Sequence, residues 1–171
     1  MLLMLPALID IGLNLAHDSF DADRDAVLDR ADAARVRYML VTGSCLPSNQ
    51  AAIDLVRRYP DRMRATAGVH PHHAAEFHSG HRAALSAFLS QTEVVATGEC
   101  GLDYFRNLSP RADQLRVFRL MLELAVESRK PLFLHQRDAH DDFAGLLREF
   151  LSQTAGGVAH CFTGTLEQAR V

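Results

Sequence analysis

Six short apolar runs recur along this chain, and their spacing constrains the fold more than any other feature. They span residues 7–12, 36–43, 63–70, 93–99, 131–135 and 156–160, and each is bounded by glycine, proline or a polar residue, as buried strands are. Successive runs begin about 25 to 38 residues apart, which is near the length of one strand with its crossover helix. This alternation predicts a parallel sheet covered by helices.

Helical spacing of apolar residues fills the intervals between these runs. It is clearest over residues 24–34, 49–59 and 112–128. In the last segment Leu115, Phe118, Leu122 and Ala125 recur at intervals of three and four residues, which predicts one buried stripe on a helix. The sequence shows no linker, low-complexity stretch or exact internal repeat, so we expect a single domain over residues 1–171.

The composition limits the partners that the chain can have. Lys plus Arg number 18 and Asp plus Glu number 21, for a net charge of −3, so any contact with nucleic acid has to be local, through a metal or a small basic patch. No apolar run approaches the roughly 18 residues that span a bilayer, so no membrane association is expected. The three cysteines are widely separated and form no Cys-x-x-Cys pair, which indicates reduced thiols in an intracellular protein.

Polar side chains lie at the ends of five of the six apolar runs and decide between two parallel-sheet architectures. They are Asp10 and Asn14 at the end of the first run, His70 and His72 at the third, Glu99 at the fourth, His135 at the fifth and His160 at the sixth. In an open sheet these groups would be spread out along one edge. In a (β/α)8 TIM barrel the carboxyl ends of all strands converge on one mouth, where active sites lie. We therefore expect a barrel. A complete barrel takes about 250 residues, so an incomplete domain, truncated after about six β/α units, is expected.

Three of these residues have the chemistry of metal ligands. Glu99, His135 and His160 occupy the same position after three consecutive strands. Carboxylate and neutral imidazole bind zinc, manganese or iron, and carboxylate also suits magnesium. Any one histidine after an apolar run is more often a hydrogen-bonded core residue than a metal ligand. Together the three would leave a buried polar cluster without a cation, so the sequence predicts a metal site with these residues as its ligands and catalytic centre.

Other polar residues near the strand ends have roles that the sequence leaves open. His70 and His72 are candidates for contact with substrate or phosphate. Arg137 is a third candidate for phosphate binding, but a surface ion pair with Asp138 or Asp141 would explain it as well.

Three further residues are expected to support the ligands. Asp103 is suited to orient a ligand histidine by accepting its second ring N–H, although a cap for the following turn is an equal alternative. Asp10 and Asn14, which end the first run, are expected to lie behind the ligands in the same way.

Five motifs in this order resemble the TatD family of metal-dependent deoxyribonucleases. They read IDIGLNL, TAGVHPH, GECGLDYFRN, FLHQRDAH and AHCFTGT, and together they span about residues 8–165. The resemblance implies a barrel of the amidohydrolase-like, metal-dependent hydrolase type. It also implies a cytoplasmic phosphodiesterase that trims DNA from the 3′ end, with Glu99, His135 and His160 as its metal ligands.

The chain departs from the family pattern at two places. The first strand carries Asp10 and Asn14 where most members have a D-x-H-x-H pattern, so we expect Mg²⁺ at the site, with Mn²⁺ or Zn²⁺ as alternatives to it. The T-D-A-P motif that supplies a further metal-site aspartate is missing, so we expect an N-terminal portion of the enzyme with impaired activity.

The function expected from these observations is hydrolysis of DNA phosphodiester bonds, with single strands or 3′ ends as substrate. Two alternatives stay open. The same metal site could cleave a small amide, ester or lactone. The chain could also be a catalytically inactive fragment that acts only through association with a partner, because an open barrel exposes two strand edges.

Overall fold

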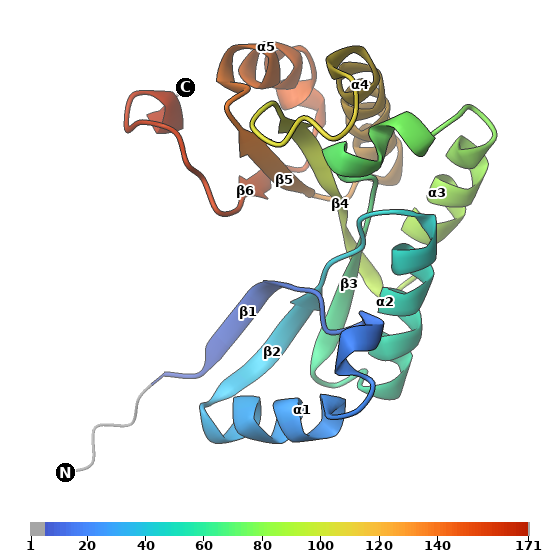
Figure 1. The fold of residues 1–171 in the computed structure, drawn as a ribbon, viewed down its shortest axis with the longest axis vertical. Coiled ribbons are helices and arrows are strands. Elements are labelled where there is room, and N and C mark those ends of the chain that lie inside the picture. The colour runs from blue at the N-terminus through green and yellow to red at the C-terminus, as the bar shows by residue number, and fades with distance from the viewer. Residues whose placement is uncertain (1–5, 171) are drawn as a thin grey trace.

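The computed structural model describes residues 6–170 and contains six parallel strands with helices along one side (Figure 1). The strands are β1 (Leu8–Leu13), β2 (Val36–Val41), β3 (Met63–Ala67), β4 (Val94–Asp103), β5 (Leu132–Arg137) and β6 (Gly157–Ala159). The helices are α1 (Arg24–Ala33), α2 (Leu46–Arg58), α3 (His81–Leu89), α4 (Arg111–Ser128) and α5 (His140–Phe150). Short 3₁₀ turns are η1 (Asp18–Phe20), η2 (Pro71–Glu76), η3 (Leu151–Gln153) and η4 (Gln168–Arg170).

The order of the strands in the sheet follows their order in the chain. Each strand pairs in parallel with the next, from β1 to β6, and the helices lie on the convex side of the curved sheet (Figure 1). A doubly wound open sheet reverses its strand order at a switch point and carries helices on both faces. The six strands therefore form a curved part of a β/α barrel, which confirms the fold class predicted from the sequence.

The main hydrophobic core lies between the sheet and the helices. Strand residues on the convex face, such as Val41 and Met63, are almost completely buried against the helical layer. The stripe predicted on α4 is buried at Phe118, Leu122 and Ala125 and half-buried at Leu115. Burial of a large apolar side chain contributes about 1.5–3 kcal/mol, so this interface holds the strands in place. None of the helices among residues 6–170 is both long and apolar enough to cross a bilayer.

The strands at the two ends of the sheet are much more exposed than those in its centre. All of β1 except Leu13 is exposed, and Ile9 and Tyr38 are 63% and 55% accessible. Within the described residues, β1 and β6 each pair on one side only. Unpaired parallel edges are templates for association. Association through these edges stays a prediction.

Strand β4 continues beyond the end expected at Glu99 and runs to Asp103. The register with β5 shifts between Gly98 and Cys100, and Gly98 and Gly101 have φ values of 145° and 144°, a region that side chains rarely adopt. A Cβ atom at Gly101 would lie 1.9 Å from the carbonyl oxygen of His135. The two glycines therefore let β4 pass very close to β5, and this contact sets Glu99 beside His135.

We expect a Gly101→Ala substitution to destabilise the protein by at least about 2 kcal/mol, because the new methyl group clashes with the backbone of β5 and the residue has a positive φ. A matched control is Gly145→Ala in α5, where an added Cβ meets nothing within 4 Å. That change is expected to stabilise the helix by about 0.5–1 kcal/mol. Urea unfolding measures both. Equal changes in unfolding free energy for the two substitutions would show that the close β4–β5 contact does not require glycine at position 101.

Candidate metal centre

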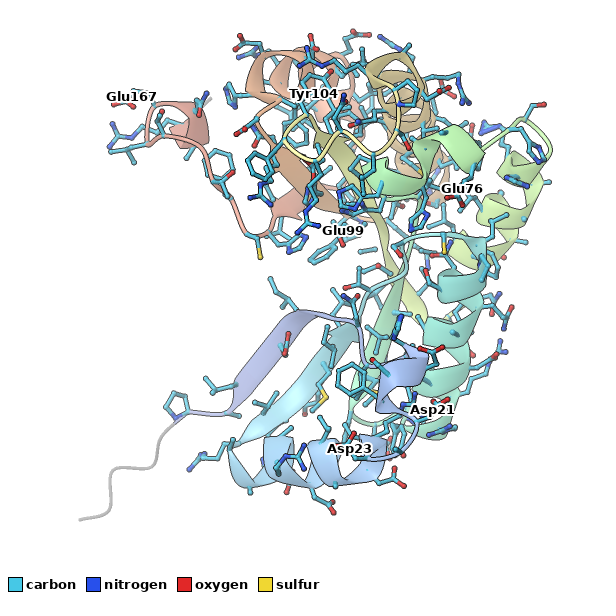
Figure 2. All side chains as sticks on the ribbon, in the orientation of Figure 1. Asp21, Asp23, Glu76, Glu99, Tyr104 and Glu167 are labelled. Atoms are coloured by element: carbon cyan, nitrogen blue, oxygen red, sulfur yellow. The ribbon has the colours of Figure 1, made fainter. Side chains whose placement is uncertain are left out.

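The residues of the predicted site come together at the carboxyl ends of four neighbouring strands. Glu99 is in β4 and His135 in β5, His160 directly follows β6, and His70 follows β3 after two further residues. Glu99 lies on the concave side of the sheet among the side chains of these strand ends (Figure 2). Because parallel strands end at the same edge, four distant segments of the chain supply one cluster.

One carboxylate oxygen is the centre of this cluster. Oε1 of Glu99 lies 3.1 Å from Nδ1 of His135, 2.7 Å from Nε2 of His160 and 3.5 Å from Nε2 of His70. The Glu99 side chain is mostly buried, and burial by itself would raise its pKa. The hydrogen bonds with His135 and His160, and to a smaller extent the electrostatic effect of His70, outweigh burial, so the pKa of Glu99 falls below its usual value. Glu99 is therefore an ionised group held by three imidazoles.

The Asp103 carboxylate contacts two of the imidazoles on the side away from Glu99. Its Oδ2 lies 3.2 Å from Nε2 of His135 and 2.8 Å from Nε2 of His72, and its Oδ1 accepts the Arg106 backbone N–H at 2.8 Å. Asp103 therefore contacts a predicted ligand and also caps the following turn, and its role in orienting His135 stays a prediction. The His135 ring thus faces one carboxylate with each nitrogen, Glu99 with Nδ1 and Asp103 with Nε2. If Nε2 carries the proton and donates it to Asp103, Nδ1 is the nitrogen that would face a cation.

His70, which was predicted to contact substrate, is buried and forms part of the cluster. Desolvation by burial lowers the pKa of His70 to about 3, although Glu99 opposes this shift, so the ring is neutral at pH 7. Its Nδ1 accepts the backbone N–H of His72 at 3.1 Å. The proton of the neutral ring then lies on Nε2, which faces Glu99. His70 in this tautomer points an N–H towards Oε1 of Glu99, 3.5 Å away, and has no free lone pair for a cation.

The donors fit a divalent cation by distance and by chemistry. Neighbouring ligands on an ion with bonds of about 2.1 Å are about 3 Å apart, close to the spacing of the imidazole nitrogens from Oε1 of Glu99. By distance alone, His70, Glu99 and His135 form a group whose ligand atoms all lie within 4.8 Å of one another. His160 lies outside this group, although its Nε2 is 2.7 Å from Oε1 of Glu99 and its ring is stacked on Phe133 at a centroid distance of 4.4 Å.

The remaining predicted residues lie outside the cluster. Asp10 is exposed and accepts the backbone N–H of Gly12, and Asn14 is exposed at the end of β1. Within residues 6–170, no hydrogen bond joins either side chain to Glu99 or to the histidines around it. The guanidinium of Arg137 lies 3.9 Å from the ring centroid of Phe105, and no ion pair joins it to Asp138 or Asp141 in the described part of the chain.

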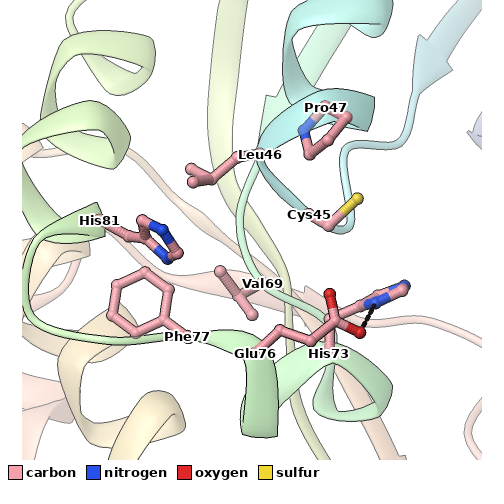
Figure 3. A pocket seen from close by; sticks show the side chains of 8 residues that line it. All are labelled: Cys45, Leu46, Pro47, Val69, His73, Glu76, Phe77 and His81. Carbon is pink, nitrogen blue, oxygen red and sulfur yellow. Dashed lines mark hydrogen bonds and ion pairs between the residues drawn. The ribbon is translucent and has the colours of Figure 1, made fainter.

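Two cavities lie near the cluster without containing it. One of about 290 Å³ opens beside η2, where His73 and Glu76 are 3.1 Å apart (Figure 3); its lining residues are Cys45, Leu46, Pro47, Val69, His73, Glu76, Phe77 and His81. A second, of about 620 Å³, lies at the carboxyl ends of β1 and β2 and includes Asn14 and Phe20 in its lining. Neither is lined by Glu99, so the cluster is a separate site.

The sequence matches the family described as TatD related DNase over residues 9–171, which include the whole cluster. The chain belongs to this family. It is similar to the 3′-5′ ssDNA/RNA exonuclease TatD of Salmonella typhimurium, with 45% identity over 161 residues that cover 94% of this chain and 62% of that protein. The protein of the same name from Cronobacter sakazakii is 47% identical over 163 residues, which cover 95% of this chain and 62% of that protein.

Two solved structures of TatD proteins resemble the fold. The hydrolase TatD family protein from Entamoeba histolytica superposes with a TM-score of 0.87 at 31% identity, covering 98% of this chain and 62% of that one. YjjV, a TatD homolog from Escherichia coli, superposes with a TM-score of 0.85 at 30% identity and covers 95% and 63% of the two chains. The chain thus spans about 62% of the length of the curated relatives that it matches.

The buried neutral His70 makes the stability of the metal-free protein depend on pH. Its pKa is lower in the folded state than the usual 6.5, so the unfolded chain takes up this proton first as the pH falls. The contribution of neutral His70 to the free energy of unfolding is fully present above pH 6.5. It is lost progressively as the pH falls from 6.5 towards 3. Between pH 7 and pH 5, in EDTA, we expect the wild type to lose on the order of 2 kcal/mol more unfolding free energy than His70→Asn. Equal losses in urea unfolding would contradict a neutral His70.

Proposed function

We propose that this chain is a metal-dependent phosphodiesterase that hydrolyses single-stranded DNA or RNA from the 3′ end. The observation that carries the proposal is the Glu99 carboxylate, surrounded by imidazoles from three neighbouring strand ends. Membership of the TatD related DNase family supports it, and so do the names of relatives that are 3′-5′ ssDNA/RNA exonucleases. Because the chain spans only part of their length, the activity is a proposal for this chain.

In this proposal Glu99, His135 and His160 hold the cation and the surrounding residues prepare the substrate. A divalent cation, when bound, supplies Lewis acidity that polarises a phosphodiester and activates water. Asp103 keeps the His135 ring in the tautomer that offers Nδ1. His70 presents its Nε2–H beside Glu99, where it can donate to a phosphate oxygen. His160 directly follows β6, a strand of only three residues, and would be the third ligand.

The identity of the cation is the finer part of the proposal. The sequence predicts Mg²⁺, which prefers oxygen ligands and would be held by Glu99, water and substrate phosphate. A donor set with two imidazoles also suits Mn²⁺ and Zn²⁺, which bind nitrogen more readily. The three free cysteines fit a reducing compartment, so the cytoplasm is the location that we propose.

The decisive test is metal-dependent release of nucleotides from the 3′ end of a 5′-labelled single-stranded oligonucleotide. We expect the wild type to act with Mg²⁺, Mn²⁺ or Zn²⁺ and to stop in EDTA. Glu99→Gln keeps the volume of the side chain but removes its charge. We expect it to reduce the rate by more than about 100-fold, since substitution of residues that merely orient a ligand already costs 10–100-fold.

Glu93→Gln is the matched control. Glu93 lies just before the opposite end of β4 and pairs with Arg57 at 2.8 Å, so this variant should keep the wild-type rate. Turnover of an amide, ester or lactone panel without cleavage of nucleic acid would favour the small-molecule hydrolase instead. A folded protein that binds the cation and hydrolyses neither class of substrate would favour the catalytically inactive alternative.

A further inference from the structure

The segment that follows β4 exposes a large aromatic side chain close to the metal centre. Phe105 is 60% accessible and lies two residues after Asp103, which contacts the predicted ligand His135. Single exposed apolar residues are common on protein surfaces, so exposure alone carries no argument. What distinguishes Phe105 is the way in which its backbone and its ring are held.

The backbone of residues 104–110 is fixed by a buried glutamine. Gln114, 1% accessible, accepts the Asp103 backbone N–H at 2.8 Å and donates to the carbonyl oxygens of Asp103 and Ser109 at 3.1 and 2.8 Å. Arg106 adds a hydrogen bond from its backbone N–H to the Asp103 carboxylate. Both ends of the segment are thus tied to the residue that orients His135, and Phe105 has a fixed position relative to the metal centre.

The positively charged guanidinium of Arg137 lies over one face of the Phe105 ring. The guanidinium carbon of Arg137 lies 3.9 Å from the ring centroid, and Arg137 is opposite Asp103 in the β4–β5 register. This contact is a cation–π pair, and it keeps the guanidinium at the strand end that also carries His135. The neighbouring Tyr104 is a useful contrast, because its hydroxyl donates to Asp142 at 2.6 Å and its ring lies 4.2 Å from Arg111. Tyr104 is engaged within the fold, whereas Phe105 is open to a ligand.

We propose that Phe105 and Arg137 form a platform on which an unpaired nucleobase stacks while the guanidinium contacts the adjacent phosphate. The inference rests on the proposed function and adds to it the residues that recognise the strand next to the scissile bond. An aromatic ring beside a fixed guanidinium matches a nucleotide, which presents a flat π surface and an anionic phosphate within a few ångströms of each other. A second protein would not require this pairing of ring and charge.

The platform also explains a preference for single strands. A base in a duplex is stacked and paired, so its face cannot reach Phe105, whereas a base at a single-stranded end can. Because every base has a π face, the platform is expected to bind without strong sequence preference.

The chain contains no tryptophan, so Phe105→Trp introduces a single fluorescent probe at the platform. We expect its fluorescence to be quenched saturably by oligothymidylate with hydrolysis-resistant phosphorothioate linkages in Mg²⁺, and not by an abasic oligomer of equal length. Leu151→Trp, at a site 56% accessible in η3 after α5, is the control and should show no quenching. No quenching at position 105, or equal quenching at both positions, would overturn the platform.

Cleavage kinetics test the platform independently of the proposed function. Phe105→Ala should raise KM for a normal 3′ end by roughly 5- to 150-fold, the equivalent of 1–3 kcal/mol per stacked base, with little change in kcat. Phe105→Tyr should restore KM, and an abasic 3′ end should be insensitive to either change. Quenching in a protein that cleaves nothing would refute the proposed function but support the platform. Cleavage with unchanged KM in Phe105→Ala would refute the platform alone.

Discussion

The buried carboxylate of Glu99 is the interaction on which the rest of the structure depends. An ionised group in a low-dielectric interior costs several kcal/mol unless partners compensate it. Here the partners are three imidazoles that come from three other strand ends, and all of them approach the same oxygen atom. A barrel mouth is one of the few places where segments so distant in the sequence can meet in this way.

The position of Glu99 follows from an irregularity in β4. Without the positive φ values at Gly98 and Gly101, the strand could not approach β5 so closely, and Glu99 and His135 would move apart. Beyond Glu99 the same strand delivers Asp103, which holds the far side of the His135 ring. One strand therefore supplies both the charge at the centre of the cluster and the group that orients its partner.

Much of this architecture could be predicted from the sequence, because apolar runs and their spacing report burial directly. The six strands lie where the runs predicted them, and Glu99 in β4, His135 in β5 and His160 just after β6 lie close together. The continuation of β4 past Glu99 could not be predicted, since two glycines near a charge are typical of a strand end. The position of His70 just after β3 pointed to its place in the cluster. Its tautomer depends on the hydrogen bond from the His72 backbone N–H, which the spacing of residues in the sequence does not reveal. Phe105 gave no signal, because its role depends on the register that brings Arg137 beside it.

The central claim is that Glu99 and two imidazoles form a cation site at the ends of the strands. Anomalous diffraction at the manganese absorption edge from crystals grown with Mn²⁺ tests it most directly. We expect a peak within about 2.0–2.3 Å of Oε1 of Glu99, of Nδ1 of His135 and of Nε2 of His160, with Nε2 of His70 farther away. A peak elsewhere, or none at this cluster when manganese is bound at other sites, would contradict a cation site at Glu99.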